Sequence, residues 1–202
     1  SSEVIKKIKP LLDEIEKDGI KLVLKGEAEK NAELRRDMLL ATALALVLIM
    51  ISMLYLFNSF RETFIVMSVI PFSILGVLIG HQVMGLNLSM PSMIGALGLA
   101  GVVINDGIIM MTYLKKARTL DEIFDKATKR FRPIILTTVT TVVGMLTLIL
   151  YPSGEAVIFQ PIAIALGFGL AWGTVLNLIY VPILYTLTHK LKRNKEYHVN
   201  TN

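Results

Sequence analysis

The 202-residue sequence predicts an all-α membrane protein, a bundle of five transmembrane helices preceded by a small αβ piece. Apolar residues make up 53% of the chain and charged residues 18%, below the roughly 25% of ordinary globular domains. Four segments contain no charged residue when His81 is counted as neutral: 38–60, 63–105, 133–154 and 156–188. A helix needs roughly 20 apolar residues to cross a bilayer core, so each segment is long enough to span it.

The segment 63–105 is too long for one helix and is interrupted at 85–91, Gly-Leu-Asn-Leu-Ser-Met-Pro. This stretch combines a helix breaker, turn formers and a proline suited to a helix start. We therefore expect five spans, at about 38–57, 64–84, 92–114, 133–151 and 159–186. The last exceeds the bilayer thickness, which predicts tilt, and Pro182 predicts a kink near its end.

The net charge of +5 and the pI near 9.4 have their origin in the loops. Every Lys and Arg after residue 37 lies in 58–63, 115–132 or the tail 189–202, whereas the loops 85–91 and 152–158 have none. Basic loops stay on the cytoplasmic side, so we expect a cytoplasmic C-terminus and an N-terminal segment outside. The excess of positive charge therefore indicates how the chain is oriented in a lipid bilayer, and it predicts no nucleic-acid partner. Within the second basic loop, residues 118–131 predict an amphipathic helix at the cytoplasmic interface.

The N-terminal residues predict a helix over 2–18, from apolar residues at helical spacing, and a strand over 20–24. From Ala28 a charged helix runs into the first span. We expect two parts, an αβ piece at 1–27 and a transmembrane domain at 28–202. One helix and one strand cannot bury a core. Residues 1–37 lack a signal peptide but are predicted to lie outside, so we expect the chain to be the C-terminal piece of a longer protein.

Six motifs follow one another in the order of a known transporter family. They are Gly26-Glu27-Ala28-Glu29, Phe57-Asn58-Ser59-Phe60, Val69-Ile70-Pro71-Phe72-Ser73-Ile74-Leu75-Gly76, Gly101-Val102-Val103-Ile104-Asn105-Asp106-Gly107-Ile108, Arg130-Phe131-Arg132-Pro133-Ile134-Ile135-Leu136-Thr137-Thr138 and Gln160-Pro161-Ile162-Ala163. With these motifs the chain resembles the last five of the twelve spans of resistance-nodulation-division (RND) exporters of the AcrB/AcrD/AcrF type.

This resemblance implies a secondary active transporter, not an enzyme, that exports drugs and amphiphiles across the bacterial inner membrane. The proton gradient would supply the energy, without a cofactor. Residues 1–27 would close the last periplasmic porter subdomain. The implied partners are the N-terminal half of the same transporter, two further copies in a homotrimer, a periplasmic adaptor and an outer-membrane channel.

The resemblance also indicates a proton relay. The family's aspartate pair lies in a fourth span that is not in this chain, and its partners here would be Asn105, Asp106, Arg130 and Thr137. Asp106 is the only acid within a span, where a charge costs roughly 2.5–3.5 kcal/mol, so it should face protein or water. Asn105 stands where multidrug members often carry a lysine. Neighbouring residues differ by about 100° around a helix, so Asn105 and Asp106 cannot point at one partner.

Each of these residues has an alternative role. Asp106 could be a structural hydrogen-bonding residue, and Arg130 could anchor the helix at the lipid phosphates. Thr137 could bond only a carbonyl of its own helix, as hydroxyls in spans usually do. No catalytic residue and no metal site are expected, although Met84, Met90 and Met93 near the outer ends of two spans leave a soft-metal reading open.

Small residues at regular spacing predict close helix packing. They are Gly76, Gly80, Gly95, Gly98, Gly101, Gly169 and Gly173. Three alternatives to drug export remain, namely export of heavy-metal cations, export of proteins or lipids by the same superfamily, and a membrane scaffold without transport. No Walker A sequence is present, so ATP-driven transport lacks support.

Overall fold

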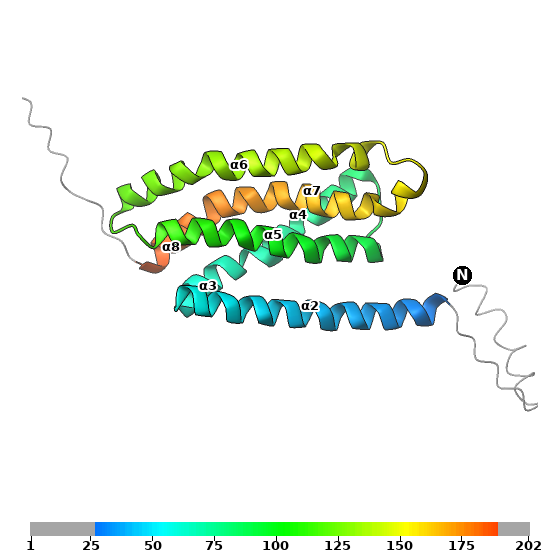
Figure 1. Cartoon of the computed structure of the whole chain (residues 1–202), viewed down its shortest axis with the longest axis horizontal. Coiled ribbons are helices and arrows are strands. Elements are labelled where there is room, and N and C mark those ends of the chain that lie inside the picture. Colours follow the sequence, from blue (N-terminus) through cyan, green and yellow to red (C-terminus); the bar gives the residue numbers. More distant parts are fainter. Residues whose placement is uncertain (1–26, 190–202) are drawn as a thin grey trace, which may run out of the picture. The chain divides into compact units, whose positions relative to one another are not determined.

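A computed structural model describes residues 27–189 of the chain. The helix predicted at 2–18, the strand at 20–24, nearly all of the αβ piece, and the tail after residue 189 lie outside the described residues. The regular elements of 27–189 are all helical (Figure 1), namely α2 (Glu27–Phe57), α3 (Phe60–Met67), α4 (Val69–Met84), α5 (Met90–Leu114), α6 (Leu120–Leu150), the 3₁₀ helix η1 (Gly154–Phe159), α7 (Gln160–Val175), the π-helical η2 (Leu176–Tyr180) and α8 (Val181–His189).

Five of the continuous helical stretches in the described range are long and apolar enough to cross a membrane: 33–57, 60–84, 90–114, 120–150 and 154–189. The first belongs to α2, which runs without a break through the charged stretch that begins at Glu27. The chain divides into two units, residues 1–43 and 44–202. The second unit contains the end of α2 and, within residues 27–189, all the other helices, and the following paragraphs concern it alone.

Helix α7 is the centre of this unit, because it packs against α4, α5 and α6 (Figure 1). Glycines allow the close approach to α4. A Cβ atom added at Gly76 would lie 2.6 Å from Cβ of Trp172 and 2.8 Å from the carbonyl oxygen of Phe168, and one added at Gly80 would lie 2.6 Å from the Phe168 side chain. Such distances are well inside van der Waals contact, so the two backbones can meet only where side chains are missing.

The contact between α5 and α7 follows the same rule. A Cβ atom at Gly95 would lie 2.8 Å from Cβ of Ala165, one at Gly173 would lie 2.6 Å from Val103, and one at Gly169 would collide with Leu99. Gly98 is less crowded, with a nearest contact of 3.6 Å, and Gly101 meets nothing within 4 Å among the described residues. A packing role for Gly101 therefore stays a prediction.

The turns lie where the sequence places breakers. Asn58 ends α2 with a positive φ of 50°, a conformation that asparagine tolerates better than most residues. Helix α4 ends at Gly85, whose φ of 66° is left-handed. Helix α5 then begins after Ser89 with a capping box, in which Ser92 is the reciprocal partner, and with Pro91 in the first turn. The interruption predicted at 85–91 is confirmed.

The helix that contains the fourth span begins earlier than predicted. Pro133 was expected to be its start, but α6 begins at Leu120 and runs through Pro133 to Leu150. Most of the stretch predicted as an amphipathic helix, 118–131, is thus helical and continuous with the span. Thr119 caps its first turn by accepting a hydrogen bond from the backbone N–H of Glu122. Proline removes one backbone hydrogen bond, and the helix continues because full turns on both sides sustain it.

The fifth span changes geometry near its end instead of continuing as one α-helix. The π-helical η2 separates α7 from α8, and Pro182 follows directly after the first residue of α8. Proline cannot donate a backbone hydrogen bond to the preceding turn, and π segments occur where the regular ladder is disturbed. The π segment lies just before Pro182, and the kink expected at Pro182 stays a prediction.

Candidate functional site

A pocket of about 200 Å³ opens between α5, α6 and α7. All four residues named as relay candidates line it: Asn105 and Asp106 from α5, and Arg130 and Thr137 from α6. Apolar side chains form most of the rest of the wall, among them Val102, Ile109, Ile134 and Leu170. Residues 25 positions apart in sequence are therefore brought to one cavity within the spans.

Asp106 and its neighbour Asn105 differ in solvent exposure. Asp106 is 8% exposed, whereas Asn105 is on the exposed face of α5. No ion pair of Asp106 occurs within residues 27–189. A buried carboxyl without a fixed counter-ion can exchange a proton with groups in the pocket, which is what a relay requires.

Arg130 does not form an ion pair with Asp106. Its guanidinium lies 3.5 Å from the centroid of the Tyr113 ring, in a cation–π contact. Because α6 continues through this position, Arg130 extends from a helix and not from a loop end. The stacking holds a permanent positive charge at the side of the pocket nearer the end of α5.

The threonines of α6 bond mostly within their own helix. The Thr137 hydroxyl donates to the carbonyl of Ile134 at 2.9 Å, which leaves its lone pairs for the pocket. Thr138, also in the pocket lining, differs because its hydroxyl lies 2.7 Å from that of Thr174 on α7. This contact links α6 to α7, and no sequence pattern distinguishes Thr138 from the neighbouring threonines.

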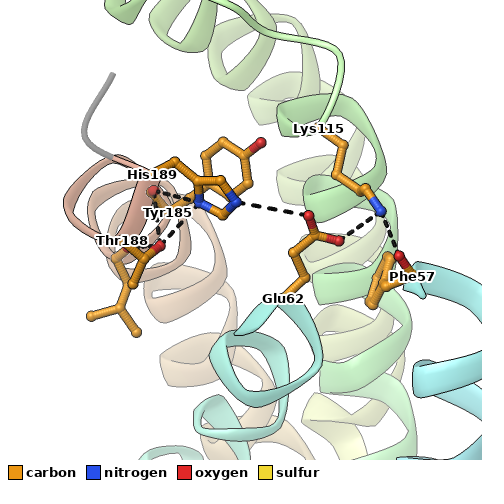
Figure 2. Close-up of polar contacts among 7 residues, drawn as sticks. Phe57, Glu62, Lys115, Tyr185, Thr188 and His189 are labelled. Carbon is orange, nitrogen blue, oxygen red and sulfur yellow. Dashed lines mark hydrogen bonds and ion pairs between the residues drawn. The ribbon is translucent and has the colours of Figure 1, made fainter. Parts of the chain in front are cut away.

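A second polar cluster lies where α3 begins and where α5 and α8 end (Figure 2). The Glu62 side chain is 8% exposed, and its Oε2 lies 2.7 Å from Nζ of Lys115, which also donates to the carbonyl of Phe57 at 2.7 Å. Nε2 of His189 lies 3.9 Å from Oε1 of Glu62, and the imidazole stacks on Tyr185. From sequence, Glu62 and Lys115 belong to the loops 58–63 and 115–132, and no local pattern in either loop predicts that the two side chains meet.

His81 has two partners, although the sequence showed none. Its Nδ1 lies 2.9 Å from the carbonyl of Val77 and its Nε2 lies 2.7 Å from the hydroxyl of Ser92, so the imidazole joins α4 to the first turn of α5. Both ring nitrogens are occupied in these contacts. No group of three or more His, Cys, Asp or Glu side chains with metal-binding geometry is present among the described residues.

A protein-family model matches nearly the whole chain. The model of the AcrB/AcrD/AcrF family matches residues 1–189. The chain belongs to this family of RND transporters. It is therefore part of a multi-pass membrane protein and of a family of secondary active transporters, not enzymes.

The curated relatives of this chain are named for different functions. The chain is 32% identical over 161 residues to the multidrug resistance protein MdtC of Erwinia amylovora, covering 77% of this chain and 16% of that protein. It is 25% identical over 157 residues to the cobalt-zinc-cadmium resistance protein CzcA of Cupriavidus metallidurans, covering 75% of this chain and 15% of that protein. The swarming motility protein SwrC of Bacillus subtilis is 27% identical over 184 residues, covering 88% of this chain and 18% of that protein.

Solved structures agree on the fold. A heavy metal efflux pump in its first crystal form matches 94% of this chain and 19% of its own, with a TM-score of 0.73 and 22% identity. The second crystal form matches 81% of this chain and 16% of its own, with a TM-score of 0.71 and 26% identity. The chain spans less than a fifth of the length of these proteins.

Proposed function

We propose that this chain is the C-terminal transmembrane portion of an RND exporter that moves small molecules across the bacterial inner membrane, driven by protons. The supporting observation is the pocket that brings Asn105, Asp106, Arg130 and Thr137 together. In this proposal Asp106 takes up and releases the proton. Arg130 supplies a fixed positive charge, and the Thr137 hydroxyl and the Asn105 amide orient the exchanging groups.

The proposed topology has the end that carries Glu62 and Lys115 in the cytoplasm, since the basic residues after position 37 gather in the loops at that end. The open face of α5 at Gly101 and Asn105 would meet the relay aspartates of the N-terminal half. The homotrimer, the periplasmic adaptor and the outer-membrane channel belong to this proposal as partners expected of the family.

The test replaces Asp106 in the full transporter, in cells that lack other exporters. Asp106→Asn should lower the tolerated concentration of ethidium to that of cells without the transporter, while the protein level in the membrane stays unchanged. Asp125→Asn is the matched control, because Asp125 is an exposed residue of α6 that pairs only with Lys129 among the described residues. Equal resistance in wild type and Asp106→Asn would refute the relay role of Asp106.

Export of heavy-metal cations is the second candidate function, and the similarity to CzcA and to the heavy metal efflux pump favours it. The same cells distinguish the two cargoes. Tolerance of cobalt, zinc and cadmium without tolerance of ethidium indicates a cation exporter, and the reverse pattern indicates a drug exporter. Asp106→Asn should abolish either one, because the proton step is common to both.

A further inference from the structure

Tyr113 contacts a residue of the pocket wall without lining the pocket itself. It follows Asp106 by seven residues on α5. Seven residues make about two helical turns, a rise of about 10 Å and a net rotation of only about 20°. Ile109, one turn from each, lines the pocket between them. Tyr113 and Asp106 therefore lie on the same face of α5, with Tyr113 nearer its C-terminal end.

The Tyr113 ring fixes the place of the Arg130 charge. Cζ of Arg130 lies 3.5 Å from the ring centroid, well within the range of about 6 Å for a cation–π contact. Nζ of Lys116 lies 5.6 Å from the same centroid, so Arg130 is the closer of the two cations. No ion pair of Arg130 with an acid occurs within residues 27–189. The stacking on Tyr113 is thus the contact that holds the guanidinium in the described part of the chain.

The place of this charge affects the protonation of Asp106. An arginine paired with a carboxylate in an apolar site makes strong charge-assisted hydrogen bonds and favours the ionised form. Asp106 paired in this way would take up a proton only at lower pH. With the guanidinium held on a ring two turns away along α5, the carboxyl has no fixed counter-ion and can exchange its proton.

Other charged groups of the described helices do not face Asp106. Arg130 is the one other charged residue of the pocket wall within 27–189. Helix α7 and η2, which also pack against α5, contain no charged residue, and Lys126 and Lys129 of α6 pair with acids of their own helix. His81 of α4 is bonded to Ser92 in the first turn of α5, and the ionisable side chains of α8 belong to the polar cluster of Figure 2.

We propose that Tyr113 is a positioning residue of the proton relay, whose ring keeps the Arg130 guanidinium away from the Asp106 carboxyl. Released from the ring, the long Arg130 side chain turns along the pocket, which both residues line, and pairs with the Asp106 carboxylate. The effect of Tyr113 on the protonation of Asp106 does not depend on transport. Its effect on export rests on the proposed function.

The first experiment measures the protonation of Asp106 without transport. N,N′-dicyclohexylcarbodiimide reacts with protonated carboxyl groups in apolar surroundings, and mass spectrometry of the full transporter in detergent gives the labelled fraction of Asp106 as a function of pH. In Tyr113→Leu the pH of half-maximal labelling should fall by about one unit or more, because an opposite charge close to a carboxyl favours its ionised form by that amount. Tyr113→Phe keeps the ring face and should match the wild type.

Two further variants separate the charge effect from the shape of the side chain. Replacing Tyr113 by 4-cyanophenylalanine keeps a ring of similar length but withdraws electron density from its face, so the half-maximal pH should fall as in Tyr113→Leu. Tyr55→Leu is the matched control, because Tyr55 is 91% exposed on α2, and it should leave the half-maximal pH unchanged. An unchanged value in Tyr113→Leu, or a fall that 4-cyanophenylalanine does not reproduce, would overturn the proposal.

The second experiment tests the consequence for export. In vesicles that contain the full transporter, the pH profile of cargo-dependent proton flux should move to lower pH by about one unit in Tyr113→Leu and stay in place in Tyr113→Phe. Normal flux in Asp106→Asn would refute the proposed function. An unchanged pH profile in Tyr113→Leu, with Asp106→Asn inactive, would refute the role of Tyr113 while sparing that of Asp106.

Discussion

The contact between α4 and α7 at Gly76 provides a quantitative test of the packing. In Gly76→Ala the new Cβ would stand 2.6 Å from Cβ of Trp172 and 2.8 Å from the backbone oxygen of Phe168, where carbon atoms prefer 3.5–4.0 Å. Neither contact atom is the end of a flexible side chain, so the helices must separate. Overpacking of this kind costs about 1–3 kcal/mol.

Gly144→Ala is the control, because an added Cβ there meets nothing within 4 Å in the described part of the chain. Both changes gain the same helix propensity, about 1 kcal/mol, so the difference between them isolates the clash. Thermal unfolding of the purified transporter in detergent measures the difference, and because the shift per kcal/mol falls as the unfolding unit grows, the prediction is the sign of the shift. Gly76→Ala should melt below Gly144→Ala, and equal melting temperatures would refute the packing described for α4 and α7.

Three further predictions use the same thermal assay. Lys115→Met should destabilise the protein by about 1–3 kcal/mol, since it leaves Glu62 buried without its ammonium partner, and adding Glu62→Gln should recover most of the loss. If the double variant is no more stable than Lys115→Met, the ion pair does not explain the effect. Thr138→Val should lower the free energy of unfolding by about 1 kcal/mol. Adding Thr174→Val should lower it little further, because both changes remove the same hydrogen bond. Additive losses in the double variant would contradict the link between α6 and α7. Pro133→Ala should raise the melting temperature, because it restores a hydrogen bond inside α6, and a lower value would contradict the helical assignment there.

Much of the helix order could be predicted because its signals are local. Long uncharged runs require spans, and Gly85, Ser89 and Pro91 set a helix end and a helix start through their own backbone preferences. Helix α6 shows where local reasoning fails. Pro133 has the chemistry of a helix start, but the amphipathic turns before it are capped at Thr119 and continue into the span.

The pocket was partly predictable, since the four residues were selected from the family motifs and all four line one cavity in the structure. Their contacts were not predictable. A span that is apolar on every side carries little periodic signal, so its rotation about its own axis cannot be derived from sequence. That rotation determines three contacts. The Asn177 amide donates a hydrogen bond to the carbonyl of Val103, Arg130 stacks on Tyr113, and the His81 imidazole bonds the hydroxyl of Ser92.

Asp106 is proposed to couple proton movement to export. Its most direct test is proton flux in vesicles that contain the full transporter and a pH-sensitive dye, with ethidium or cadmium as the cargo, according to which one the growth test identifies. Adding the cargo under an imposed pH gradient should produce proton flux in the wild type and in Asp125→Asn, and none in Asp106→Asn. Cargo-dependent proton flux of normal size in Asp106→Asn would contradict the account.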